Sequence, residues 1–155
     1  MSVFLTIFSG VTVFVIGQIV LKLFIDPIQD FKKVIGETSN CLINNAGNYF
    51  EPEKLSEEKQ GEVAQELLRL SAKLNAQMSV IPLYSKLSRI YSCPSTDDVV
   101  VASKNLIEIS NAMRSNRPNN GKLNAFSAQR VQQALGIHMD ESARLDPAHE
   151  RTFRQ

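Results

Sequence analysis

The N-terminal segment constrains this chain most, because no ionisable side chain occurs between Met1 and Leu21. As an α-helix rising about 1.5 Å per residue, the stretch 3–25 would be about 34 Å long, enough to cross a hydrocarbon core of about 30 Å. A core helix of a soluble domain would show a polar face, which this stretch lacks. No basic residue precedes it and no small-residue cleavage pattern follows it, so a signal peptide fits poorly. The sequence predicts a retained transmembrane helix over 3–25.

The flanks of this segment predict its orientation. No Lys or Arg precedes it, whereas Lys22, Lys32 and Lys33 lie at or beyond its end. Basic residues gather on the cytoplasmic side of a membrane span. We therefore expect a single-pass protein of the bacterial inner membrane, with the N-terminus outside and residues 26–155 in the cytoplasm. Cys41 and Cys93 show neither metal-site nor disulfide-framework spacing, which agrees with a reducing compartment.

Small residues recur along one face of the predicted span at four-three-four spacing. Such a face lets two helices approach closely in lipid, so the pattern predicts an oligomer interface. The alternative is that Gly is simply common in membrane spans. The residues of this face are Thr6, Gly10, Val13 and Gly17.

Two polar residues stand near the cytoplasmic end of the span. Gln18 and Lys22 are four residues apart and therefore share one side of a helix. A Gln in lipid is costly unless it finds a partner. In an oligomer the two residues would line a narrow pore, and in a monomer they would lie at the membrane surface.

The remainder of the chain has the apolar periodicity of helices and no strand-like alternation, so the predicted fold class is all-α. We expect a stalk helix over 26–50 that continues the span, with weak points at Gly36 and at Asn44–Asn45. A cytoplasmic helical domain over 51–137 and a flexible tail over 138–155 follow. The domain's helices are expected over 56–78, 83–91, 95–114 and 125–135. Ser95 and Asp98 predict a capping box for the third, and Gly136 predicts the end of the last.

Catalytic signatures are missing from the sequence. It contains no phosphate-binding loop, no dinucleotide glycine motif, no HExxH and no GxSxG. His138 and His149 lie at or beyond the end of the last expected helix, where a general base would not be held against a substrate. We therefore expect no enzymatic activity, no cofactor and no metal site.

A basic window follows the third predicted helix of the domain. No acidic residue occurs between Glu108 and Asp140. Arg and Lys bind phosphate, and the Asn and Gln residues of the window could read base edges. The window predicts a nucleotide or oligonucleotide site, and the alternative is a solvated basic loop. Its basic residues are Arg114, Arg117, Lys122 and Arg130.

Three stretches resemble a family of small bacterial inner-membrane proteins with one span. They read GQIVLKLFIDPIQDFKKVIGE, LLRLSAKLNAQMSVIPLYSKL and CPSTDDVVVASKNLIEISNAM. The resemblance covers residues 4–113 and leaves the tail after residue 137 without a counterpart. In size and layout the chain is also similar to the membrane effectors of the Hailong anti-phage system.

The resemblance implies an oligomeric membrane toxin, with a tetramer favoured by the resemblance alone. It also implies a nucleotidyltransferase partner, whose short single-stranded DNA oligomers hold the toxin inactive, and it places that ligand in the basic window. The expected function is a pore-forming or membrane-depolarising effector of anti-phage defence, gated by a ligand on its cytoplasmic domain. The alternative is a non-conducting membrane anchor or adaptor that recruits a soluble partner.

Overall fold

The computed structural model describes residues 2–115, 120–139 and 144–146, and every regular element in these ranges is a helix. The predicted all-α class is confirmed for this part of the chain. The elements, in chain order, are α1 (Ser2–Val20), the π-helical turn η1 (Leu21–Ile25), α2 (Asp26–Asn44), α3 (Ala46–Phe50), the 3-10 turn η2 (Pro52–Lys54), α4 (Glu57–Val80), α5 (Tyr84–Ile90), α6 (Thr96–Met113) and α7 (Asn120–Ala134).

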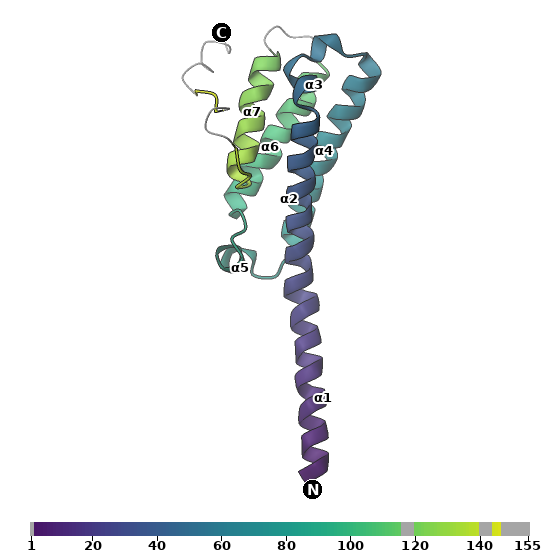
Figure 1. The fold of residues 1–155 in the computed structure, drawn as a ribbon, viewed down its shortest axis with the longest axis vertical. Helices are drawn as coiled ribbons and strands as arrows, with labels where there is room; N and C mark the ends of the chain where they lie inside the picture. The colour runs from purple at the N-terminus through teal and green to yellow at the C-terminus, as the bar shows by residue number, and fades with distance from the viewer. Residues whose placement is uncertain (1, 116–119, 140–143, 147–155) are drawn as a thin grey trace.

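The first three elements form one continuous helix, whose N-terminal half projects alone from a bundle of α2, α4, α6 and α7 (Figure 1). Every residue over 3–23 is exposed, Phe24 is half-buried, and Ile28 is the first residue of the long helix in the bundle core. Within the described ranges one helix, Val3–Asn44, is long and apolar enough to cross a membrane, with a mean hydropathy of 2.2 in its most apolar window. None of that window is buried, unlike the core helix of a soluble domain.

A wide turn joins the projecting helix to the bundle. The backbone N–H of Asp26 donates to the carbonyl of Leu21, five residues back, instead of four. Pro27 accounts for this turn, because Pro has no N–H to donate and its ring crowds the carbonyl four residues before it. The long helix passes Gly36 without interruption and ends at Asn45, where φ is −101° and ψ is 14°.

The segment expected to be a stalk, 26–50, includes α2, which lies in the helical bundle. The side chains that α2 buries recur three or four residues apart, as on the apolar face of an amphipathic helix. They pack into the same core as α4 and α6. The buried residues of α2 are Ile28, Phe31, Val34, Thr38, Cys41 and Leu42. The predicted stalk helix therefore packs along the bundle over α2, while the boundary at residue 50 stays a prediction.

Small side chains line the contact between α4 and α6. The hydroxyl of Ser110 donates to the carbonyl of Ala64 over 2.7 Å, and that of Ser71 donates to the carbonyl of Ser103 over 3.1 Å. The side-chain amide of Asn75 donates to the Ser103 hydroxyl over 2.9 Å. These bonds satisfy polar groups that would be costly to bury alone. Large apolar side chains fill the space beside them: Leu67, Leu70, Leu74, Leu106 and Ile109.

Side-chain caps set the helix ends of the bundle. The predicted capping box of α6 is confirmed, with Asp98 N donating to Ser95 Oγ and Ser95 N donating to the Asp98 carboxylate. Gly136, at φ 67°, ends α7 as predicted. However, α7 begins at Asn120 rather than at residue 125. The Asn120 amide donates to the carbonyls of Ala112 and Ser115, which ties the first turn of α7 to the end of α6.

Part of the C-terminal tail contacts the bundle. The Gln129 side chain of α7 donates to the Leu145 carbonyl over 3.1 Å and accepts from the Leu145 N–H over 2.7 Å. The side-chain amide of Gln129 thus satisfies both the N–H and the carbonyl of Leu145, as the backbone of a neighbouring strand would. The pair fixes the described segment 144–146 against the middle of α7.

Candidate functional site

The face predicted for self-association is open in the single chain. Thr6, Gly10, Val13 and Gly17 are all exposed on α1. A Cβ added at Gly10 or Gly17 would have no described atom within 4 Å, apart from the backbone of its own helix. The glycines therefore leave a shallow strip along the helix into which a second helix could pack. Association itself stays a prediction.

The two residues predicted to line a pore lie at the junction with the bundle. Gln18 is exposed on the last turns of α1, and Lys22 lies in the wide turn η1. The ammonium of Lys22 is 3.0 Å from the carboxylate of Asp26 on its own helix. In an assembly each copy would therefore bring an ion pair, rather than a bare positive charge, to this level. The pore-lining role stays a prediction.

The basic window is spread out in space rather than gathered. Arg114 is exposed at the end of α6, and Lys122 is exposed in the first turns of α7. Arg130 is half-buried eight residues further on, about 12 Å along the helix axis. Arg117 lies outside the described residues.

An acidic residue also reaches the window from a neighbouring helix. Ser127 of α7 donates to the Glu108 carboxylate of α6 over 3.1 Å, three residues before Arg130. Lys122 and Arg130 both already interact with other groups of the chain. Arg114 and Lys122, the exposed members of the window among the described residues, lie near the joint of α6 and α7.

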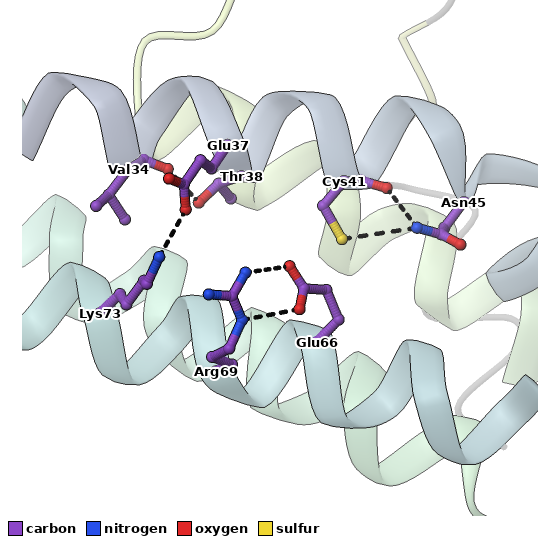
Figure 2. A network of polar contacts seen from close by, with 8 residues as sticks. All are labelled: Val34, Glu37, Thr38, Cys41, Asn45, Glu66, Arg69 and Lys73. Carbon is purple, nitrogen blue, oxygen red and sulfur yellow. Dashed lines mark hydrogen bonds and ion pairs between the residues drawn. The ribbon is translucent and has the colours of Figure 1, made fainter.

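A polar groove of about 350 Å³ lies between α2 and α4. Figure 2 shows its two ion pairs, Glu37 with Lys73 at 2.9 Å and Glu66 with Arg69 at 2.6 Å. The first pair links the two helices, whereas the second lies within α4. Arg69 binds Glu66 through two nitrogens and thereby lowers the pKa of the Glu66 carboxyl. Two acids and two bases balance, so the groove offers an anion no net attraction.

Cys41 is the reactive group nearest to this groove. Its side chain is buried on α2, and the Asn45 amide lies 3.7 Å from the sulfur (Figure 2). Burial first, and the charge of Glu66 next, raise the pKa of the Cys41 thiol. A thiol held in its protonated form is a poor nucleophile. The described residues contain no group of three His, Cys, Asp or Glu side chains that could hold a metal.

A feature that the sequence prediction missed lies at the end of the bundle from which α1 projects (Figure 1). We call residues 80–90, the end of α4 with the turn and α5, the anchor-side corner. The inner side of α5 is held by Tyr84, whose ring meets Phe31 of α2 at 5.6 Å. Its outer side carries large apolar groups beside Lys86 and Arg89, which are also exposed. The exposed apolar residues are Val80 at 61%, Leu83 at 64% and Ile90 at 72%.

The sequence held a signal for this corner. No acidic residue occurs over 67–96, a stretch about as long as the basic window after Glu108. The corner also contains Pro82, which lies between α4 and α5. A charge bias in a connecting segment indicates a contact surface only once the position of that segment in the fold is known, and here the segment lies at the end of the bundle from which α1 projects (Figure 1).

Comparison of the chain with protein-family models, with curated proteins and with solved structures found no match in any of the three. The class of the protein is therefore defined by its fold: over the described residues it is all-helical, and one apolar helix, long enough to span a membrane, projects from a helical bundle.

Proposed function

We propose that the protein is a membrane effector that acts as a homo-oligomer, in which several copies of α1 pack through Gly10 and Gly17 and permeabilise the bilayer. The observation that carries the proposal is the continuity of α1 with α2. One helix contributes both the exposed apolar segment and a buried side of the bundle. A change in the packing of α2 would therefore move the membrane segment without passing through a flexible linker.

The input to such an effector would be a ligand on the cytoplasmic bundle. The resemblance in the sequence suggests a short single-stranded DNA oligomer, made by a partner nucleotidyltransferase of an anti-phage locus. A ligand shifts a conformational equilibrium only if it binds one state better than the other. The joint of α6 and α7, with Arg114 and Lys122, is the proposed contact, since bonds from Asn120 fix this joint.

Membrane potential tests the effector proposal. We expect cells that express the full chain to depolarise, as followed with a voltage-sensitive dye. The double variant Gly10→Leu/Gly17→Leu should lose the effect, because leucines keep neighbouring helices apart. The matched variant Gly10→Ala/Gly17→Ala keeps a small-residue face and should retain it. Equal depolarisation by the leucine variant at equal membrane levels would contradict assembly through this face.

Ligand binding tests the proposed input. A labelled single-stranded oligodeoxynucleotide should bind the full chain in detergent, and Arg114→Glu/Lys122→Glu should weaken binding by at least about tenfold at low salt. Lys86→Glu/Arg89→Glu makes the same charge change at the opposite end of the bundle and should leave binding unchanged. Binding that survives the first variant would remove the window from the proposal.

An adaptor is the second candidate, and the Lys22–Asp26 pair favours it. A charge compensated on its own helix offers a permeating ion less than a bare ring of lysines would. An adaptor predicts an unchanged membrane potential. It also predicts that Gly10→Leu/Gly17→Leu still recruits the same soluble protein to the membrane, as seen by crosslinking in intact cells. An effector instead predicts that the membrane potential collapses in cells that express the chain.

A further inference from the structure

We propose that the anchor-side corner, 80–90, docks on the surface of the bilayer that α1 crosses. Leu83 and Ile90 would enter the boundary between headgroups and acyl chains, and Lys86 and Arg89 would meet lipid phosphates. The proposal rests on the membrane insertion of α1, which the proposed function also assumes. It does not rest on oligomerisation or permeabilisation.

The length of the exposed helix places the bundle directly on the membrane. The exposed residues 3–23 span about 31 Å, close to the roughly 30 Å of a hydrocarbon core. Phe24, the next residue, is half-buried, and Ile28, about one turn further on, lies in the bundle core. At most about one helical turn separates the exposed segment from the bundle core, so the end of the bundle meets the headgroup layer.

The contacts of α5 bring it to this level. Phe31, which packs against Tyr84, lies eight residues beyond Leu23, about 12 Å further along the long helix. The headgroup layer is about 5–8 Å thick on each side. An α-helix with its side chains is about 10–12 Å wide. A helix packed against Phe31 on the anchor side of the bundle, where Figure 1 places α5, can therefore reach this layer with its outer face.

The outer surface of the corner suits this position. Leu83 is held at φ 54°, a left-handed conformation that residues other than Gly rarely adopt, and its side chain is 64% exposed. Lys86 and Ile90 are four residues apart and share a face of α5. Apolar side chains beside basic ones are the composition of elements that lie in a membrane surface.

The acidic groups near the corner are largely occupied. Asp26 pairs with Lys22 and Asp30 pairs with Lys33 on the long helix. Asp98 accepts the capping bonds at the start of α6. Asp97, also at the start of α6, is exposed. We therefore expect the attraction of the corner to anionic lipid to come chiefly from Lys86 and Arg89.

Bromine quenching of a single Trp tests the docking, since the chain has no Trp of its own. Ile90→Trp would report on the corner, and Phe14→Trp on the anchor. Ile43→Trp is the matched control, because Ile43 is 63% exposed near the opposite end of α2. The full-length variants are placed in phosphatidylcholine vesicles with about one third phosphatidylglycerol, and some phosphatidylcholine is brominated at the upper acyl chain.

We expect Ile90→Trp to be quenched at least about twofold more strongly than Ile43→Trp. Equal quenching of the two, with Phe14→Trp strongly quenched, would overturn the docking and leave the anchor in place. An unquenched Phe14→Trp would overturn the docking together with its premise. A blue-shifted Ile90→Trp emission without bromine quenching would mean that a second copy, rather than lipid, covers the corner, and would also overturn the proposal.

The phosphate contact is tested in the same vesicles. Adding Lys86→Glu/Arg89→Glu to Ile90→Trp should reduce its quenching to the level of Ile43→Trp. Quenching that persists would overturn the role of the basic residues. Neither result depends on depolarisation of cells, so failure of the docking and failure of the effector proposal remain distinguishable.

Discussion

The ring of Tyr84 in α5 meets the ring of Phe31 in α2 edge to face, with the ring centroids 5.6 Å apart. The Tyr84 hydroxyl also donates to the carbonyl of Pro94 over 2.6 Å, one residue before the cap of α6. One side chain therefore holds α5 against both the long helix and the start of α6.

This double contact makes Tyr84 a sensitive position. We expect Tyr84→Phe to lower the free energy of unfolding by about 1 kcal/mol, since it removes the hydrogen bond to Pro94. Tyr84→Ala should lower it by about 3 kcal/mol, because it also opens a cavity beside Phe31. Urea unfolding in detergent, followed by circular dichroism, measures both. The prediction is wrong if Tyr84→Ala costs no more than the control Tyr91→Phe, a change at a half-buried tyrosine.

We expect substitution by alanine to have opposite effects on stability at two of the glycines. A Cβ at Gly121 would collide with the backbone carbonyl of Phe50, which has no flexible end to move aside. Gly121→Ala should therefore destabilise the bundle by more than about 2 kcal/mol. Gly61 lies in α4 with open space around it, so Gly61→Ala should stabilise it by about 0.5–1 kcal/mol. Thermal unfolding of the two variants gives the sign of each change in stability. Changes of the same sign would contradict the packing of α3 against α7.

Tyr49 predicts a loss of stability at alkaline pH. Its side chain is 4% exposed, and burial raises its pKa to about 12. An unfolded tyrosine loses its proton near pH 10. The folded chain therefore binds more protons between these values, so its free energy of unfolding falls as pH rises, by up to about 3 kcal/mol. Tyr84, whose pKa burial also raises, acts in the same direction.

The substitution Tyr49→Phe isolates this contribution. We expect its unfolding free energy to fall less steeply than that of the wild type between about pH 10 and about pH 12. Below pH 9 or so, where both phenols are protonated in either state, the two slopes should coincide. Parallel curves over the whole alkaline range would show that Tyr49 does not titrate with folding.

Leu83 allows membrane contact to be separated from folding. Asn adopts the left-handed conformation more readily than Leu, so Leu83→Asn should leave stability in detergent unchanged or raise it by up to about 1 kcal/mol. The same change removes an apolar group from the corner and should reduce the quenching of Ile90→Trp by brominated lipid. A variant that unfolds more easily than the wild type would mean that the Leu83 side chain stabilises the bundle.

The helices were readable from the sequence where the signal is local. The uncharged N-terminal run, the stripe Leu67–Leu70–Leu74 and the box of Ser95 and Asp98 each depend on residues within a few turns. The start of α7 depends instead on carbonyls of Ala112 and Ser115, reached by Asn120 only once α6 is in place. A turn signal such as Asn120–Gly121 therefore gave no reason to begin a helix there.

Two features of the segments with a predicted function depend on contacts between helices, which the sequence does not show. The stripe with Ile28 and Phe31 on α2 needed a partner to bury it, and the stalk interpretation left it without one. The basic window was defined by spacing along the chain, whereas the turn of α7 separates Lys122 from Arg130, and Ser127 brings in Glu108. Charge counted in sequence does not include what a neighbouring helix contributes.

The wide turn at Leu21–Ile25 sets the rotation of α1 relative to α2 about the axis of the long helix. Each residue of an α-helix advances the chain by about 100° around the axis, and the five residues of this turn together advance it by about one residue less. If the turn tightened to an ordinary α-helix, the anchor would swivel by about a quarter turn against the bundle. The wide turn therefore sets which face of α1 lies on the same side of the long helix as the buried face of α2.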